Sequence, residues 1–360
     1  MLVIVLVTIL FASAALVMFI EKASDDLVVD AREAAARRLR QEAYSALDVT
    51  LAVLTDFRMV NGGLHSVAEG WNDPLGFAGW EPREGCTAEV SFEDESGKLS
   101  LPHADSATLV NLFQGWGMSQ VNAEHLADVL LAWMQKDHVT SSATPPDYDQ
   151  GALPYTAPLR SLRSFSELSA IDYARDVFYD DNGRPNDLWA RFVGAVSLYD
   201  FKQTNINGAR GDVLGALGSL DITQQKQLAE YLDGTGSRAR EGPAFFESTS
   251  EAANVIGTGV LPQGYGTQIS ALRINITIHE GRTAFHLSVV VTSPGGASAV
   301  QAVASTNSSN PSSSTSPAAT PAASPAASAN SAKKLNYPFT LLEIKENAEI
   351  AVVPAPSTKA

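Results

Sequence analysis

The chain has 360 residues and a formal net charge of −15, with 40 acidic side chains against 25 basic ones. Because an acidic surface repels phosphate, nucleic acid is not expected as a partner. Cys86 is the only cysteine, so the fold cannot rest on an internal disulfide. The length is sufficient for two or three compact units, each with its own core.

The first 20 residues, MLVIVLVTILFASAALVMFI, carry no charge. A run of this length can cross a hydrocarbon core of about 30 Å as a helix. No Gly or Pro interrupts residues 1–60, and strong helix formers dominate 31–54. We therefore predict one continuous helix, with a transmembrane part over 1–20 and an amphipathic continuation over 21–60.

No basic residue precedes the apolar run, although orientation in a membrane normally needs positive charge on the cytoplasmic side. We therefore expect that the reading frame starts upstream of Met1 or that the chain is a processed form. A signal anchor followed by a stalk is the simpler interpretation of the same segment. The alternative is a helix that is inserted in the membrane first and packed in a filament later.

Apolar residues recur at three- and four-residue steps in the amphipathic continuation, with charged residues between them. This spacing is typical of a helix with one apolar face. We expect this face and the start of the helix to pack against neighbouring helices. The residues assigned to that interface are Val5, Leu39, Ala43, Leu47, Leu51 and Leu54.

Beyond the long helix, the pattern changes several times. Residues 61–85 predict loop and short turns, and 86–93 alternate as a strand does. ALRINITIH and AFHLSVVVT also alternate, and the short turn at 280–282 between them predicts a hairpin. YPFTLLEIKENAEIAVVP supplies one or two final strands. Helices are predicted near 105–115, 119–135, 164–179, 186–196, 209–218 and 222–232.

This order of elements predicts an α+β fold, in which a large all-α domain is inserted into a head with a small antiparallel sheet. Residues 293–334 are almost entirely Ser, Ala, Pro and Asn, which cannot bury a core and should be flexible. The expected units are a split head over 61–104 and 254–353, the insertion over 105–253, this tract within the head, and a tail over 354–360.

The helical block contains a faint internal repeat. LPHADSATLVNL at 101–112 aligns without a gap with INGARGDVLGAL at 206–217, and a second amphipathic helix follows each. Two helix–turn–helix pairs would explain the likeness, and so would chance similarity of helical periodicity.

Motifs for catalysis are scarce. The sequence has no G-x-S-x-G elbow, P-loop, H-E-x-x-H motif or Cys/His cluster. Ser331 to Lys334 spells S-x-x-K within the Ser/Ala/Pro tract, where no site can be preorganised. YDDNGRPND at 179–187 could hold a hard cation through oxygen ligands or could form a plain turn. We expect no enzymatic activity and no firmly bound cofactor.

Several short segments, taken in order from the apolar start, resemble the type II secretion minor pseudopilin K, the general secretion pathway protein K family. The matching residues are Asp94, Gly97, Lys98, Leu99 and Ala104; Trp133 and Asp137; Ser164, Glu167 and Leu168; and Asn205, Ile206, Asn207, Ala209 and Leu214.

The resemblance implies a pilin-like protein in the inner membrane, single-pass, with the bulk of the chain in the periplasm. It implies a place at the tip of a short pseudopilus, where the chain assembles with other minor pseudopilins to initiate or cap the filament. Further implied partners are the inner-membrane assembly platform and the lipid around residues 1–20. The rival hypothesis is a signal-anchored periplasmic module whose helical domain binds a ligand.

The sequence departs from the family pattern in ways that affect metal binding. Family members can bind calcium through acidic side chains of the helical domain, and Asp137, Asp147 and Asp149 remain as weak candidates. Ala132 and Gln135 stand where the family has carboxylates. Because Ca²⁺ takes six to eight oxygen ligands, we expect weak calcium binding or none.

Overall fold

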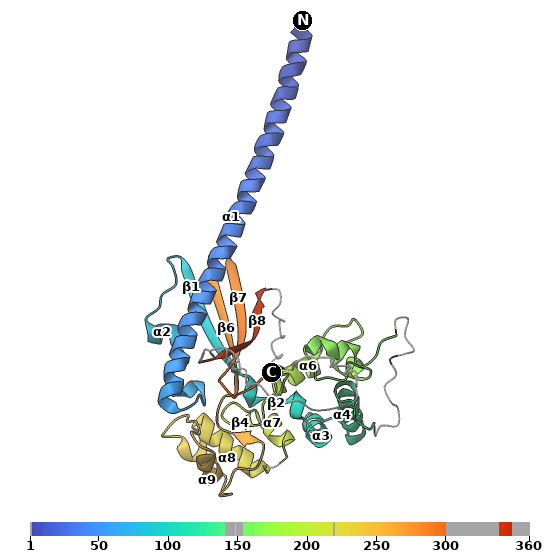
Figure 1. The fold of residues 1–360 in the computed structure, drawn as a ribbon, viewed down its shortest axis with the longest axis vertical. Helices are drawn as coiled ribbons and strands as arrows, with labels where there is room; N and C mark the ends of the chain where they lie inside the picture. The colour runs from blue at the N-terminus through green and yellow to red at the C-terminus, as the bar shows by residue number, and fades with distance from the viewer. Residues whose placement is uncertain (1, 141–147, 149–153, 219, 300–337, 348–360) are drawn as a thin grey trace, which may run out of the picture.

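The computed structural model describes residues 2–140, 148, 154–218, 220–299 and 338–347. Its first element, α1 (Leu2–Asn61), is one unbroken helix of 60 residues. The N-terminal half of α1 projects away from the rest of the protein, and its C-terminal half lies on a sheet (Figure 1). The continuous helix predicted from the absence of Gly and Pro is confirmed.

The sheet has four antiparallel strands in the order β1-β6-β7-β8. The predicted hairpin is present, because Glu280 pairs with Thr283 across the turn. Gly281 in that turn has a φ of 59°, a conformation that costs glycine little. The strands are β1 (Cys86–Asp94), β6 (Ala271–Glu280), β7 (Thr283–Thr292) and β8 (Thr340–Glu346).

One core fills the space between α1 and the sheet. Alternate residues of β6, Leu272, Ile274, Ile276 and Ile278, face the helix and are almost completely buried. Opposite them lie the apolar residues of α1 that are spaced by three and four positions: Leu39, Ala43, Leu47 and Leu54.

These four residues correct the expected interface with neighbouring helices. Their exposed fractions are between 0% and 3%, and Leu51 packs partly buried against the same core. The apolar face of α1 is therefore covered by the protein's own sheet. Periodicity identified the face correctly, but it cannot say whether the covering surface comes from the same chain.

The helical region contains two hydrophobic clusters rather than one. The first gathers α3 (Ser106–Gly115), α4 (Gln120–Met134), α5 (Ala174–Phe178) and α6 (Asp187–Ala195). The second gathers α8 (Ile222–Asp233) and α9 (Thr249–Val255). The short helix α7 (Gly211–Ala216) joins them, because Val213 belongs to the first cluster and Leu214 to the second. The pairs α3/α4 and α7/α8 occupy the two segments of the faint repeat.

Several local expectations need correction. The predicted helix at 164–179 is broken into a 3₁₀ turn, Phe165–Ala170, and α5, with Tyr173 at a φ of 60° between them. The ring of Tyr173 stacks on His125 of α4, a contact between distant segments that favours the break. The stretch predicted as loop contains α2 (Pro74–Ala78), capped by the Asp73 side chain.

Two short parallel bridges show that the region between 105 and 253 is not purely helical. β2 (Leu99–Ser100) pairs with β3 (Val196–Ser197), and β4 (Thr204–Asn205) pairs with β5 (Tyr265–Gly266). Such two-residue pairings have no sequence signal of their own, since they depend on contacts between distant segments.

The start of the Ser/Ala/Pro tract is ordered. Ala297 is buried, and Ser298 exchanges two backbone hydrogen bonds of 2.9 Å with Asp200. The expected flexibility of 293–334 is therefore wrong for residues 293–299. The remainder of the tract and the tail at 354–360 lie outside the described residues.

Candidate functional site

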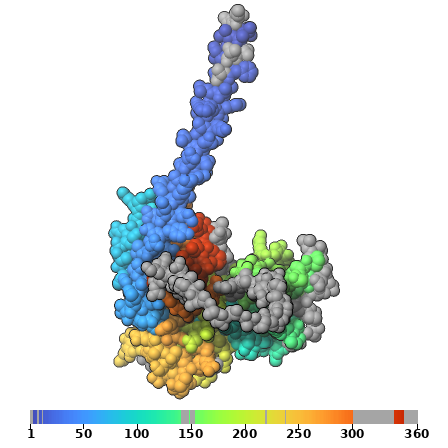
Figure 2. Space-filling model, viewed as in Figure 1, coloured from blue at the N-terminus to red at the C-terminus, as the bar shows by residue number. Residues whose placement is uncertain are grey.

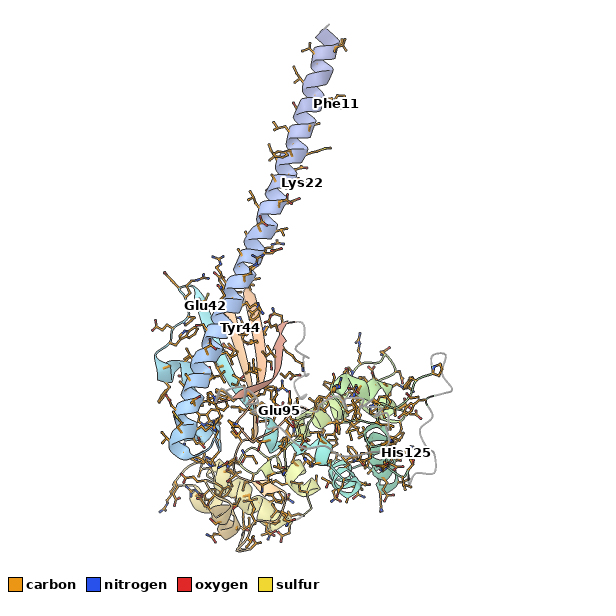
Figure 3. The ribbon with its side chains drawn as sticks, in the orientation of Figure 1. Phe11, Lys22, Glu42, Tyr44, Glu95 and His125 are labelled. Carbon is orange, nitrogen blue, oxygen red and sulfur yellow. The ribbon has the colours of Figure 1, made fainter. Side chains whose placement is uncertain are left out.

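The projecting half of α1 is a rod of exposed apolar side chains. Val3, Leu10 and Phe11 have exposed fractions of 72%, 65% and 69%. Within the described part of the chain, α1 is the one helix long and apolar enough to cross a membrane. Figure 2 shows it standing clear of the head, and Figure 3 places Phe11 and Lys22 on it. Val5, 56% exposed, is the predicted interface residue on this part.

Polar contacts join α1 to β8 and to the residues just before that strand. The Nε atom of Arg40 donates to both carboxylate oxygens of Glu346 on β8, at 3.0 and 3.1 Å. The hydroxyl of Tyr44 donates to the same carboxylate at 2.6 Å. Near the end of the helix, Arg58 Nη1 donates to the carbonyl of Pro338 at 2.6 Å. β8 and the residues just before it thus contact α1 along one flank.

A buried pair holds the chain where it leaves α1. The Nδ1 atom of His65 lies 2.7 Å from Oε1 of Glu69, and both side chains are almost completely buried. Glu69 also accepts hydrogen bonds from Trp71 Nε1 and from Asn61 at the end of α1. Burial alone would raise the pKa of Glu69, but the hydrogen bonds from His65 and Asn61 outweigh it and lower the pKa. No pattern in the sequence predicted this pair.

The two family-like segments at 94–98 and 205–209 meet in a joint between the sheet and the helices. Oδ1 of Asp94, at the end of β1, accepts from the backbone N and the hydroxyl of Ser96 at 2.9 and 2.6 Å. Oδ2 of Asp94 accepts from Asn205 Nδ2 at 2.7 Å. The same Nδ2 donates to the carbonyl of His65 at 3.0 Å. One amide of β4 thereby contacts both β1 and the segment that follows α1.

Close backbone contact explains the glycine of the first segment. A Cβ atom on Gly97 would lie 2.6 Å from the carbonyl carbon and oxygen of Gly208. A side chain there would have to displace backbone, so the joint needs glycine at this position.

Asn207 anchors the second helical cluster to the joint. Its Nδ2 donates to the carbonyls of Phe246 and Thr267 at 3.0 and 2.9 Å, and its Oδ1 accepts from Phe246 N at 2.7 Å. With both of its donors and its oxygen engaged, this side-chain amide holds backbone that lies outside regular helices and strands. The residues of the resemblance in this segment therefore act in positioning.

A network of charges completes the joint on the face of the sheet away from α1. Arg273 of β6 donates to Glu95 at 2.7 Å and to Glu343 of β8 at 3.1 Å, and Lys98 pairs with Glu95 at 3.2 Å. Burial would raise the pKa of Glu95, but the charges of Lys98 and Arg273 outweigh it and lower the pKa. Figure 3 places Glu95 between the sheet and the helices.

Asp94 behaves differently from Glu95, although the two are adjacent. Burial of its carboxyl group raises its pKa to about 6, and the hydrogen bonds from Ser96 and Asn205 compensate only in part. No cation contacts its carboxylate among the described ion pairs. Burial thus gives the joint a carboxyl group, Asp94, whose pKa of about 6 lies well above its ordinary value.

The other residues of the resemblance are structural as well. Ser164 caps the 3₁₀ turn, and Glu167 binds Arg160 Nη1 at 3.1 Å. Leu168 and Trp133 are buried in the first cluster, where the Trp133 ring lies against those of Tyr148 and Tyr155.

The metal candidates do not form a site in the described part of the chain. Asp137 is exposed beyond the end of α4, whereas Asp147 and Asp149 lie outside the described residues. Among the residues that are described, no three His, Cys, Asp or Glu side chains gather closely enough to hold a metal. Weak calcium binding or none stays a prediction.

The Asp/Asn-rich loop at 179–187 is a plain turn. Asp180 Oδ1 accepts from the backbone N atoms of Asn182 and Arg184 at 2.9 and 2.8 Å. These bonds use one carboxylate oxygen of Asp180 to hold the turn.

Comparison with known proteins connects these features to a family. Residues 94–180 match the family described as type II secretion system (T2SS), protein K. The chain matches no curated protein in sequence. Its fold is similar to a chain in the crystal structure of the GspK–GspI–GspJ complex from the type 2 secretion system of enterotoxigenic Escherichia coli.

That similarity has a TM-score of 0.51 at 15% sequence identity, and it covers 74% of this chain and 96% of the other. The matched segment begins at Asp94 and includes most of the first helical cluster. The predicted resemblance and the predicted α+β fold are confirmed.

Proposed function

We propose that this chain, which resembles type II secretion protein K in sequence over 94–180 and in fold over most of its length, is a minor pseudopilin. Its work is assembly rather than catalysis. α1 anchors it in the inner membrane, and the head and helical clusters lie in the periplasm. It assembles with other minor pseudopilins at the tip of the pseudopilus.

The exposed half of α1 supports the assembly role. The sequence from Val3 to Ile20 is apolar apart from small or hydroxyl residues, and the side chains that the structure describes in this run are exposed. In a bilayer, lipid tails would contact this surface, so leaving the bilayer requires other helices to replace those contacts. A subunit that is alone should therefore stay in the membrane, and one with partners can leave it.

The location of the helical clusters is the observation that supports a place at the tip of the filament. α8 and α9 lie beyond the C-terminal end of α1, and α3, α4 and α6 lie to one side of the sheet (Figure 1). A repeating subunit must offer the same heterologous surface at every level of a filament. Helical clusters beyond the end of α1 would obstruct a subunit stacked above, so this chain fits at the end of a filament.

The partners that we propose are suggested by the structure to which this fold is similar. The similar structure contains proteins named GspK, GspI and GspJ in one complex. For this chain we propose that two other minor pseudopilins contact α1 and the head, and that the inner-membrane assembly platform incorporates the resulting tip.

A mixing experiment tests the proposal. The full chain is co-expressed with the minor pseudopilins encoded near it and purified in detergent, and mass is measured after size exclusion. We expect a complex that contains this chain once. Homopolymers of this chain alone, or no association with any of the others, would rule the proposal out.

A further inference from the structure

Two of the six histidines face each other on the sheet. His279 lies on β6 and His286 on β7, and their ring centroids are 6.4 Å apart with the ring planes at 89°. The adjacent residues Ile278 and Leu287 belong to the core under α1. Because side chains alternate along a strand, both rings lie on the opposite face of the sheet. His286 is exposed and His279 is half-buried, so solvent reaches both rings.

The other four histidines already have partners within the chain. Three of them have a ring nitrogen 2.6–2.7 Å from a carboxylate oxygen: His65, His103 and His138. The ring of His125 stacks on Tyr173 with centroids 4.2 Å apart. The ion pairs of the described residues include neither His279 nor His286. These two imidazoles therefore differ from the rest in facing each other without a carboxylate.

The register of the hairpin brings the two rings together. Thr277 pairs directly with His286, and His279 pairs with Ala284. The two histidines are thus diagonal neighbours on adjacent strands, a separation that long side chains can bridge. Ala284 offers only a methyl group opposite His279, which leaves room for the second ring. The backbone N of His286 also donates to Asn347 Oδ1 at 2.9 Å, so this part of β7 is held on both sides.

A hydroxyl group orients the more exposed ring. Thr277 Oγ1 lies 3.0 Å from Nδ1 of His286. In the tautomer that carries its proton on Nδ1, this nitrogen donates to the hydroxyl, and Nε2 keeps its lone pair. Histidines that bind metals have this arrangement, in which a hydrogen bond holds one nitrogen and the other binds the ion.

We propose that His279 and His286 bind a divalent transition-metal ion that favours imidazole, Zn²⁺ or Cu²⁺. Zn–N bonds of about 2.0 Å place the two nitrogens roughly 3.3 Å apart around a tetrahedral ion. Rotation of the exposed His286 side chain brings the rings to that separation, since exposed side chains change rotamer readily. The described residues hold no group of three His, Cys, Asp or Glu ligands, so water fills the remaining positions. The site is independent of the assembly proposed above.

The ion joins β6 to β7 at one end of the sheet. Arg40 of α1 binds Glu346, which pairs with Leu287, whereas Arg58 further along α1 contacts Pro338. The turn of the hairpin therefore lies toward the projecting half of α1 (Figure 1). An ion that binds the paired strands and not the unfolded chain raises stability as its concentration rises.

The test measures Zn²⁺ binding by the full chain in detergent, purified without a polyhistidine tag. Calorimetric titration should give one ion per chain, and excess Zn²⁺ should raise the melting temperature. Thr277→Val should weaken binding by about tenfold, because it removes the group that orients a ligand. His279→Gln and His286→Gln should each weaken it further, because each removes a ligand. Ca²⁺, which takes oxygen ligands, should not replace Zn²⁺.

His103→Gln is the matched control, because it removes another exposed histidine, one that is paired with Asp200. Its affinity for Zn²⁺ should equal that of the wild-type chain. The melting temperatures without metal should agree for all variants, which shows that lost binding is not lost folding. No binding by the wild-type chain, binding that persists when His279 and His286 are both replaced, or an equal loss in the control overturns the proposal. The proposed assembly function stands in each of these cases.

Discussion

The two halves of α1 differ in what covers them, although both are rich in apolar residues. Leu10 in the projecting half is 65% exposed, whereas Leu47 in the half that lies on the sheet is 3% exposed. Residues 3–20 of the projecting half carry no charge on any side, and the other half has one apolar face with charged residues opposite. Apolar side chains all round predict an external apolar environment, whereas a single apolar face predicts burial against a surface that the pattern itself does not identify.

We expect a Leu→Ala substitution to cost far more stability in the buried half of α1 than in the projecting half. Leu54→Ala, in the core between α1 and the sheet, should lower the free energy of unfolding by about 2–5 kcal/mol, because it leaves a cavity. Leu10→Ala, in the projecting half, should change it by less than about 0.5 kcal/mol. Denaturation of the full chain in detergent measures both. Equal effects would mean that the halves do not differ in coverage.

The joint between the sheet and the helical clusters contains a buried carboxyl group, that of Asp94. The pKa of Asp94 is raised to about 6 from 3.8. Between these values the folded state binds a proton that the unfolded state does not, so stability from this group rises as pH falls through 6 toward 4. The gain at full protonation is about 3 kcal/mol.

The measurement compares the pH dependence of unfolding for the wild-type chain with that of Asp94→Asn. The difference between the two curves should grow in favour of the wild type from about pH 7 to about pH 4. Glu95, with its lowered pKa, contributes in the opposite direction at lower pH and is common to both proteins. A flat difference over this window would show that the Asp94 carboxyl group is not desolvated.

Gly97→Ala tests the backbone contact in the same joint. The added methyl group would collide with the carbonyl of Gly208, so we expect a loss of about 1–3 kcal/mol in stability. Gly115→Ala is the matched control, because it ends α3 with open space around its Cβ position. Its effect should be neutral or slightly stabilising. Equal losses at the two positions would contradict the close packing of the joint.

The sequence predicted the elements whose periodicity is local. The uninterrupted α1, the alternation of β6 and β7 and the helices α3, α4, α6 and α8 were all expected within a few residues of their bounds. The resemblance also selected the residues of the joint, namely Asp94, Gly97, Asn205 and Asn207. It did not say that they contact one another, because Asp94 and Asn205 are separated by 111 positions.

What the sequence could not predict depends on contacts between distant segments. The break at Tyr173 accompanies a ring contact with His125, and the bridges β2–β3 and β4–β5 consist of two residues each. The division of the helical region into two clusters rests on the two faces of α7, which is too short to show a period. Periodicity likewise predicted the apolar face of α1, but only the fold shows that the sheet of the same chain covers it.

The smallest effect is expected where the chain between β7 and β8 is shortened. Replacing residues 300–334 with a short Gly/Ser linker should leave the melting temperature within a few degrees, since loop closure costs only about 0.6 kcal/mol per doubling of length. Residues 293–299 are kept, because Ala297 is buried and Ser298 pairs with Asp200. A large loss would show that the replaced segment packs on the head.

The position of this chain in an assembled pseudopilus decides whether it lies at a filament end. A gold label on the exposed loop at 180–185, which is not part of the joint, would be located by electron microscopy of isolated pseudopili. A chain whose helical clusters obstruct stacking should place one label at one end of each filament. Labels that recur along the filament would contradict the account.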